Sequence, residues 1–451
     1  MIHLRSAAGC FSLAAILAAL HPAAPALAQA PGSVPADAAC AEGHRLAQGV
    51  CVSAGLVVDG FANLRGGIHR SAAALGQLSA ALEADLGQAI SPALEGWSFG
   101  LSTVGIHGRQ PTPTLVGSLA PVSNAEALST FRLNELWVER SWEGVAAIRL
   151  GQLAVDSEFA AAEAAGLLRN GTFGWPVALA TSLPSGGVAY PFAAPGIRLA
   201  LGDPDGATGL RLGVFAGDPG GRYGDETDPQ RHNRHGTNFS FNGGTFMILE
   251  AVTGGTAKEG PRPWTAKLGL WLHARGAFAD QRRDAEGLSL ADPASSGEPR
   301  GHRGNHGAYG IAEATLWRSG AQSLAAFGRV FAQPADRNLV SFQADAGIAW
   351  AGPFGRAGET FSLGTSFARI GQDARGLDRD IAAFGDEDRV RRDHEWVVEA
   401  SYDIPLVEGR LHLRPGLQWL VHPAAREPDE RVSGRPIRDA LVAGLRLEAT
   451  F

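Results

Sequence analysis

The stretch DALVAGLRLEATF (residues 439–451) alternates apolar and polar positions with a period of two. Its polar face carries Arg446, Glu448 and Thr450. The opposite face is apolar and consists of Leu441, Ala443, Leu445, Leu447, Ala449 and Phe451. Because successive side chains of a β-strand point to opposite faces, the stretch is predicted to be a strand with one apolar and one polar surface.

The same period recurs from Gly55 to the end of the chain and predicts about sixteen strands. Most are longer than globular strands, which average about five or six residues. A length of about nine to eleven residues suits a tilted crossing of a bilayer. The predicted strands are 55–66, 75–87, 96–107, 129–142, 146–153, 196–202, 209–216, 244–252, 264–275, 307–318, 322–332, 339–350, 359–369, 394–404, 410–421 and 439–451.

Two architectures explain such strands. A soluble sandwich would bury the apolar face and expose the polar one to water. A membrane barrel would turn the apolar face to lipid and the polar face to an aqueous lumen. The length of the strands favours the barrel, as do tryptophans near strand ends, which resemble interfacial girdles. These tryptophans are Trp97, Trp142, Trp264, Trp317, Trp350, Trp396 and Trp419.

The connections between the strands also favour the barrel, because short and long ones alternate. Short connections lie at 143–144, 203–208, 319–321, 352–358 and 406–409. Long ones lie at 108–128, 154–195, 217–243, 276–306, 370–393 and 422–438. Short turns on one side and long loops on the other are typical of outer-membrane barrels. We therefore predict an all-β fold, a transmembrane antiparallel up-and-down β-barrel of about sixteen strands over residues 53–451, whose lumen is too wide for side chains to fill.

One long connection is unusual: AVDSEFAAAEAAGLLRNGTFGWPVALATSLPSGGVAYPFAAPG (residues 154–196). It is rich in proline and glycine and keeps neither a helical nor a strand period. Long irregular loops in compact domains are usually functional. Phe173, Trp175, Tyr190 and Phe192 are too apolar for a solvated tip, so we expect the loop to fold into the barrel and narrow its lumen.

The first residues predict export. Arg5, the apolar residues 11–20 and the small residues Ala26 to Ala28 are typical of a signal peptide (residues 1–28) that is cleaved before Gln29. The apolar core is too short to span a bilayer. Residues 29–52 are predicted to form a periplasmic segment in which Cys40 and Cys51 pair as a disulfide. Metal binding by these cysteines and His44 is the rival interpretation, but that ligand set is incomplete.

Composition argues against other classes of function. The formal net charge is −7, with 19% charged residues, so there is no basic footprint for nucleic acid. Catalytic signatures such as H-E-x-x-H and a phosphate-binding loop are absent from the sequence. We expect no enzyme activity, no cofactor and no metal.

Several blocks resemble one known family. They are LNELWVERSW (133–142), RLGQLAVDSEF (149–159), NGTFGWP (170–176), LPSGGVAYPFAAPGIRL (183–199), GVFAGDPGG (213–221), NFSFNGGTFMILEA (238–251) and HLRPGLQWLVHP (412–423). Through them the chain resembles the carbohydrate-selective porins of Gram-negative outer membranes, which include the glucose porins of pseudomonads. The resemblance implies a sixteen-stranded barrel, an inward loop and passive uptake of sugars. The first hairpin and residues 31–52 depart from the family pattern.

The alternation of the strands also predicts which charged side chains face the lumen. The basic ones are Arg149, Arg198, Arg211, Lys267, Arg275, Arg329, Arg414 and Arg446, and the acidic ones are Asp59, Asp345, Glu395, Glu399 and Glu448. Arginines donate and carboxylates accept hydrogen bonds, which suits neutral sugar hydroxyls. Aromatic faces stack on pyranose rings.

We place the narrowest part of the channel at Glu135, Trp137 and Glu139, which share one face of a strand, and at Arg149 on the next strand. On the loop, Glu158 and Arg169 are predicted either to line this waist or to anchor the loop, beside Phe173, Trp175 and Tyr190. The alternative is that these charges only hydrate the lumen or brace the wall with salt bridges.

Four functions remain open at this level. They are a sugar-selective porin, a general or anion-preferring pore, an outer-membrane enzyme and a structural barrel with a closed lumen. The enzyme would need a nucleophile near His107, His273 or His306, and the sequence offers no obvious one. The predicted partners are sugars and outer-membrane lipids, and either a trimer or a monomer is compatible with the sequence.

Overall fold

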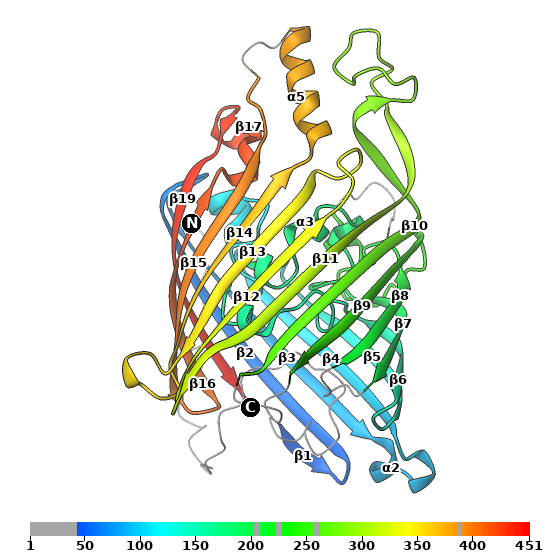
Figure 1. Ribbon diagram of the computed structural model, residues 1–451, viewed down its shortest axis with the longest axis vertical. Helices are drawn as coiled ribbons and strands as arrows, with labels where there is room; N and C mark the ends of the chain where they lie inside the picture. Colours follow the sequence, from blue (N-terminus) through cyan, green and yellow to red (C-terminus); the bar gives the residue numbers. More distant parts are fainter. Residues whose placement is uncertain (1–42, 203–207, 222–227, 256–261, 386–388) are drawn as a thin grey trace, which may run out of the picture.

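A computed structural model describes residues 43–202, 208–221, 228–255, 262–385 and 389–451. Sixteen strands form the wall of a closed antiparallel barrel (Figure 1). Each wall strand pairs with the next one along the chain, and β19 closes the barrel on β2. The short β1 adds a seventeenth strand to this sheet and pairs with β2.

The strands of the wall follow from the alternating pattern. They are β2 (Val50–Gly67), β3 (Ala72–Asp85), β4 (Trp97–Gly108), β5 (Thr130–Trp142), β6 (Ala146–Leu153), β7 (Ala194–Gly202), β8 (Thr208–Ala216), β9 (Thr245–Gly255), β10 (Trp264–Asp284), β11 (Pro299–Ser319), β12 (Gln322–Ala332), β13 (Val340–Ala351), β14 (Thr360–Ile370), β15 (His394–Val407), β16 (Leu411–Val421) and β19 (Arg438–Thr450). Three small strands lie outside the wall: β1 (His44–Ala47), β17 (Pro428–Asp429) and β18 (Arg435–Pro436).

Short helices occupy the connections. They are α2 (Leu86–Ala89), η1 (Pro92–Leu94), η2 (Thr112–Val116), η3 (Glu163–Ala165), η4 (Gly171–Phe173), α3 (Val177–Ala180), η5 (Pro184–Gly186), α4 (Pro229–His232), η6 (Pro353–Gly355), α5 (Gln372–Phe384), η7 (Pro423–Arg426) and η8 (Glu430–Val432). In Figure 1, α5 stands at one end of the barrel, and α2 and β1 lie at the other. Among the described residues, no helix is both long and apolar enough to cross a membrane.

The two surfaces of the wall differ as predicted for a membrane barrel. Outward-facing leucines are exposed, for example Leu417 at 44% and Leu445 at 48%. The neighbouring inward-facing side chains Gln418 and Arg446 are 1% and 4% exposed. The leucine faces therefore do not meet one another in a dry interior, and the soluble sandwich is excluded.

All sixteen predicted strands are present, with differences at their ends. The largest difference concerns 276–306, which we predicted to be a loop. Instead, β10 and β11 continue their pairing well into this region, as far as Asp284 opposite Pro299. Their register shifts between His273 and Ala277, where Arg275 has a φ of 62°. Strict alternation fails at this bulge, so it does not predict that Arg275 faces the lumen.

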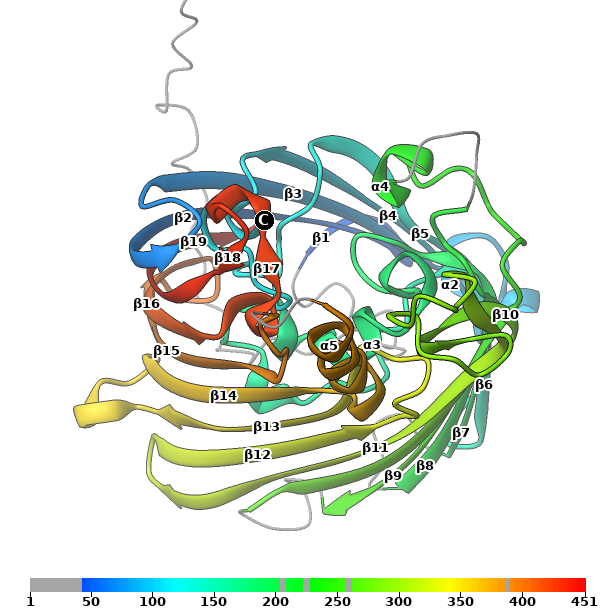
Figure 2. The same cartoon turned by 90° about the horizontal axis from the view of Figure 1, so that it is seen from above.

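Two loops fill part of the barrel. One is the predicted segment between β6 and β7, and the other is the connection between β4 and β5. We call them the long loop (residues 154–193) and the short loop (residues 109–129). Figure 2, a view along the barrel, shows α3 of the long loop enclosed by the ring of strands. The hydrophobic core therefore lies inside the barrel, where Phe173 and Leu179 of the long loop join Phe327 and Phe331 of β12 in one buried cluster.

The signal peptide and Cys40 lie outside the described residues. Cys51, near the start of β2, is buried and takes part in a disulfide. Its pairing with Cys40 remains a prediction.

Candidate functional site

Four charged side chains join the long loop to the wall at β5, β6 and β7. Arg149 donates to Glu139 at 2.9 Å and lies 3.5 Å from Glu158 of the loop. Arg198 binds both carboxylates at 2.8 Å. Each of the four side chains is less than a tenth exposed. The two positive and two negative charges balance, and their main effect is to fasten the beginning of the long loop to the wall.

Trp137 lies next to this cluster. The guanidinium of Arg149 lies 3.9 Å from the centroid of its ring, a cation–π contact. The indole packs across Gly100 of β4, where an added Cβ would lie 2.2 Å from Cε2 of the ring. Only glycine at position 100 leaves room for the ring in this orientation.

Arg329 of β12 holds the middle of the long loop. It donates to the backbone carbonyls of Ala160, Thr172 and Gly174 at 3.2, 2.7 and 3.1 Å. Two further hydrogen bonds, at 3.0 and 2.7 Å, join it to Asp345 of β13. The side chains of this pair are fully buried, so Arg329 acts here as an anchor for the loop backbone.

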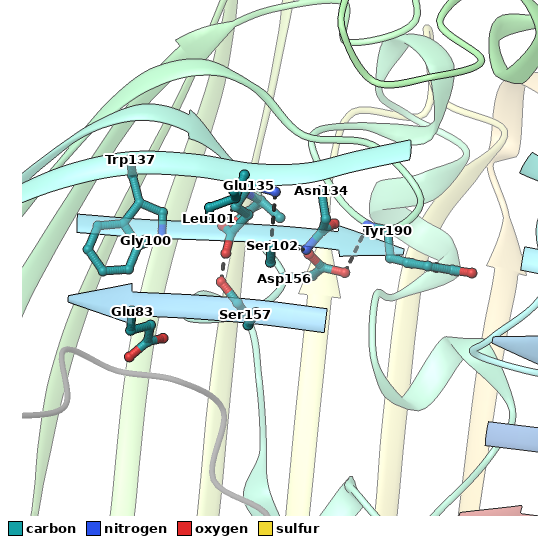
Figure 3. A pocket seen from close by; sticks show the side chains of 12 residues that line it. Glu83, Gly100, Leu101, Ser102, Asn134, Glu135, Trp137, Asp156, Ser157 and Tyr190 are labelled. Atoms are coloured by element: carbon teal, nitrogen blue, oxygen red, sulfur yellow. Dashed lines mark hydrogen bonds between the residues drawn. The ribbon is translucent and has the colours of Figure 1, made fainter. Parts of the chain in front are cut away.

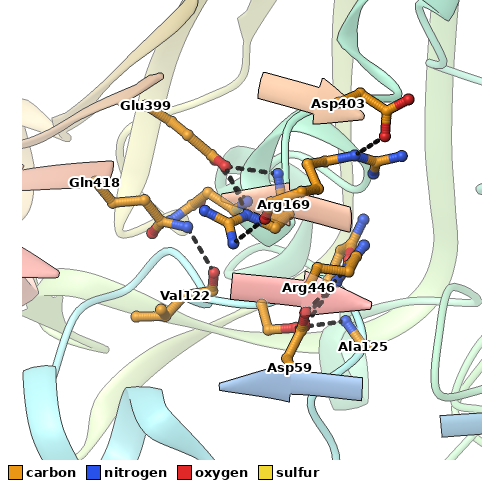
Figure 4. A network of polar contacts seen from close by, with 12 residues as sticks. Asp59, Val122, Ala125, Arg169, Glu399, Asp403, Gln418 and Arg446 are labelled. Atoms are coloured by element: carbon orange, nitrogen blue, oxygen red, sulfur yellow. Dashed lines mark hydrogen bonds and ion pairs between the residues drawn. The ribbon is translucent and has the colours of Figure 1, made fainter. Parts of the chain in front are cut away.

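Arg169 lies on the long loop itself and is held by a carboxylate of the wall. Its side chain lies 3.4 Å from Glu399 of β15, and the same carboxylate accepts from the backbone N–H groups of Arg169 and Asn170 at 2.9 and 2.8 Å. The guanidinium also stacks on Phe61 of β2, 5.5 Å from the ring centroid. Figure 4 shows Arg169 beside Glu399.

The short loop is held by the same kind of contact. Arg446 of β19 binds Asp59 at 2.7 Å (Figure 4). It also donates to the side chain of Asn124 at 2.7 Å. Gln418 of β16 donates to the carbonyl of Val122 at 2.8 Å. Glu395 accepts from the backbone at Leu119 and Ala120, at 2.8 and 2.7 Å.

The two loops also bind each other. The N–H of Asn124 donates to the carbonyl of Arg169 at 2.7 Å, and that of Gly171 donates to Pro121 at 2.8 Å. They therefore form one plug against the wall.

The remaining predicted charges also contact the plug or the wall. Arg211 donates to the carbonyl of Glu158 at 3.1 Å, and Lys267 donates to that of Ala161 at 2.8 Å. Arg414 binds Asp403 at 2.9 Å and lies 3.4 Å from Glu448.

The three predicted aromatic residues of the long loop have different surroundings. Phe173 is 2% exposed and meets Phe327 edge to face at 6.4 Å. Trp175 donates to the carbonyl of Gly186 at 2.9 Å. Tyr190 donates to the carbonyl of Ala125 at 2.9 Å and borders the open part of the lumen.

That open part is a cavity of about 330 Å³ between the long loop and the strands β3 to β5 (Figure 3). A second cavity, of about 140 Å³, shares Tyr190, Asn134 and Ser102 with it and reaches β2. The first cavity is lined by Ala81, Glu83, Gly100, Leu101, Ser102, Asn134, Glu135, Trp137, Ala154, Asp156, Ser157 and Tyr190. Glu135 and Trp137 of the predicted waist belong to this lining, whereas Glu139 and Arg149 belong to the anchoring cluster.

Two loop carboxyls near the cavity have unusual acidity. Burial raises the pKa of Asp156 to about 6, although the N–H of Tyr190 donates to this carboxyl at 2.9 Å. Burial likewise raises the pKa of Glu126 to about 7, although Thr112 donates to it at 2.8 Å. Among the described residues, no group of three or more His, Cys, Asp or Glu side chains is placed to hold a metal ion.

Some elements of the site were not singled out from the sequence. Neither Glu83 nor Glu250 was singled out as a candidate site residue. Glu250 accepts from the N–H of Ala160 at 3.0 Å and from the hydroxyl of Tyr309 at 2.7 Å. The inward fold of the short loop was also missed. Its apolar residues Leu115 and Val116, now fully buried, are the signal that could have revealed it.

A sequence profile of the carbohydrate-selective porins, OprB family, matches residues 69–451. The chain belongs to this family. The solved structure of Pseudomonas putida OprB at high pH matches this porin with a TM-score of 0.76 and 19% identity, over 89% of this chain and 94% of that one. Among curated proteins, no sequence matches.

Two further solved structures have weaker similarity. Outer-membrane expressed OmpT of Vibrio cholerae has a TM-score of 0.46 and 6% identity, over 90% of this chain and 99% of that one. The anion-selective porin from Comamonas acidovorans has a TM-score of 0.48 and 11% identity, over 90% and 100%.

Membership of the family supports the first of the functions left open by the sequence. The protein is a carbohydrate-selective porin of the outer membrane, and sugars are its substrates. Its family and fold are those of a channel.

Proposed function

We propose that sugars diffuse through the gap between the long loop and the wall strands β2 to β5. The observation that carries this proposal is the asymmetry of the plug. Arg329 and Glu399 fasten the plug to the wall at β12 and β15. The two cavities lie on the other side of the long loop.

The lining of this gap suits a carbohydrate. Ser102, Asn134 and Ser157 offer groups that both donate and accept hydrogen bonds, as sugar hydroxyls do. Trp137 and Tyr190 offer aromatic surface for the C–H face of a sugar ring. A solute that loses water on entering regains contacts with these groups, which is the general basis of selectivity in a pore.

In this proposal the buried arginines set the width of the channel and do not bind the solute. Arg149, Arg198 and Arg329 use their donors on carboxylates or loop carbonyls. A loop fixed by charge-assisted hydrogen bonds keeps a constant aperture. Passage is then passive diffusion without a catalytic step.

The setting of the channel completes the proposal. The chain is exported through a signal peptide at residues 1–28 that is cleaved before Gln29. The mature porin works as a trimer or as a monomer, which native mass spectrometry of the detergent-solubilised protein distinguishes. Sequencing of the mature amino terminus tests the cleavage site.

The test of the path compares two tryptophans that face the interior. Trp137→Ala alters the cavity, whereas Trp271→Ala is the matched control, because Trp271 is 3% exposed and packs on Phe246 away from the cavity. Liposomes that contain the wild type should swell faster in isotonic sugars than in amino acids of similar size. Trp137→Ala should change the relative rates among sugars, and Trp271→Ala should leave them unchanged. Uptake that follows solute size alone, or equal effects of both variants, would contradict the proposal.

A further inference from the structure

The lining of the larger cavity carries acidic side chains. Three carboxyl groups line it: Glu83 from β3, Glu135 from β5 and Asp156 from the long loop. Its twelve described lining residues include no arginine, lysine or histidine.

Glu83 is the most available of the three. Within the described residues it forms no hydrogen bond and no ion pair, and its side chain is only partly exposed. Glu135 uses Oε1 to accept from the N–H of Ala154 at 2.8 Å, and Asp156 uses Oδ2 to accept from Tyr190 at 2.9 Å. Each of these two carboxyls keeps a second oxygen for a further partner.

Trp137 provides an independent sign that a polar ligand fits here. Its side chain is nine-tenths buried, since the residue is 9% exposed. Among the described residues, its indole N–H has no hydrogen-bond acceptor. In Figure 3 the nitrogen edge of the ring is turned toward the side chains that line the cavity. Because no described side chain accepts from it, this N–H is free to donate to an acceptor on a passing solute.

Nearby positive charges do not cancel the acidity of the cavity. Arg149 and Arg198 are already balanced by Glu139 and Glu158. Arg132 of β5 has no acidic partner among the described residues, but it is 1% exposed, stacks on Phe192 at 4.9 Å and does not line the cavity.

We propose that this cavity favours carbohydrates with a protonated amino group, such as hexosamines, over neutral sugars of the same size and over sugar acids. The ammonium group pairs with Glu83, Asp156 adds negative potential, the second oxygen of Glu135 offers an acceptor, and a ring hydroxyl accepts from the indole of Trp137. The volume of about 330 Å³ lies at the small end of the range for small-ligand sites and suits a monosaccharide. This inference rests on the proposed path between the long loop and β2 to β5.

The test measures entry of radiolabelled glucosamine, glucose and glucuronate into liposomes that contain the full porin at neutral pH. One charge pair at about 4 Å in water is worth about 1 kcal/mol, which corresponds to an about fivefold preference. We expect glucosamine to enter about fivefold faster than glucose, and glucuronate to enter more slowly than glucose. Glu83→Gln should reduce the glucosamine preference to about onefold to twofold, because it removes the charge that pairs with the ammonium group.

Glu448→Gln is the matched control. It removes the same charge from β19, where the side chain of Glu448 is 34% exposed next to Arg414, outside the cavity lining. The control should keep the preference for glucosamine. If glucose enters but glucosamine is no faster, or if both variants reduce the preference equally, the amino-sugar inference is overturned while the sugar path stands. If no sugar enters faster than into empty liposomes, the proposed function itself fails.

Discussion

Replacing Arg329 with methionine should release the middle of the long loop without dismantling the barrel. The substitution removes the donors to the carbonyls of Ala160, Thr172 and Gly174. Hydrogen bonds from a charged donor are worth about 1.5–3 kcal/mol each, so three of them contribute at least about 4 kcal/mol to holding the loop. Since about 1.4 kcal/mol is a factor of ten, the released state should become about a thousand times more populated.

The substitution has a second cost, because it leaves Asp345 buried without its partner. Breaking a buried ion pair from one side costs about 3–5 kcal/mol. Gln343 still donates to Asp345 at 2.8 Å, so part of this cost is offset. The double variant Arg329→Met with Asp345→Asn removes the orphaned charge and isolates the effect of the lost loop anchor.

Single-channel recording in planar bilayers measures the outcome. Both variants should show larger current noise and a higher mean conductance than the wild type, and trypsin should cleave the long loop after Arg169 faster. Arg356→Met is the matched control, since its side chain is 67% exposed in a turn and lies 3.6 Å from Glu359. A folded Arg329→Met barrel with unchanged conductance, noise and cleavage would refute the idea that this arginine fixes the aperture.

Three further changes test the cavity and the cluster beside it. Gly100→Ala places a Cβ 2.2 Å from the ring of Trp137, so the ring must move and the block of current by sugars should weaken several-fold. Asp156→Asn should raise the melting temperature at about pH 7.5 and leave it unchanged at about pH 3.5. The pKa of Asp156 is raised from 3.8 to about 6, so the folded state loses stability as pH rises through that window, and asparagine removes this loss. Arg149→Ala should alter sugar block in a barrel that stays folded, because Glu139 keeps Arg198 at 2.8 Å.

The controls and contrary outcomes are specific to each change. Gly328→Ala is the control for Gly100, since the nearest atom to its added Cβ is 3.9 Å away. Equal effects of the two glycine variants would show that the ring of Trp137 does not shape the aperture. If the melting temperature of Asp156→Asn equals that of the wild type at every pH, burial of the charged Asp156 does not destabilise the folded state. If sugars block the current through Arg149→Ala as strongly as the current through the wild type, Arg149 has no role in the channel.

The sequence predicts the wall well because each strand repeats one simple rule. Side chains that face lipid are apolar and side chains that face a wide lumen are polar. Each wall strand from β2 to β19 therefore alternates apolar and polar residues. The alternating pattern does not show where a strand ends once it has left the membrane. For this reason the continuation of β10 and β11 was missed. The bulge near Arg275 was missed because an inserted residue interrupts the alternation without changing composition.

The site is predicted only in part, because alternation gives the facing of a side chain and not its partner. Alternation places both Arg149 and Glu135 on the inner surface, yet one binds Glu139 and the loop while the other lines the cavity. Contacts between the loops and distant strands decide this difference. Arg169 and Glu399, for example, are 230 residues apart, and no local pattern connects them.

The central claim is that the plug seals one side of the lumen and leaves a path along the other. Two matched variants test it directly: Ala81→Cys on β3, which lines both cavities, and Ala368→Cys on β14, which is 4% exposed in the cluster packed against the long loop. A charged, water-soluble thiol reagent should sharply reduce the single-channel current of Ala81→Cys and leave that of Ala368→Cys unchanged. Block of Ala368→Cys alone, or equal block of both, would contradict the account.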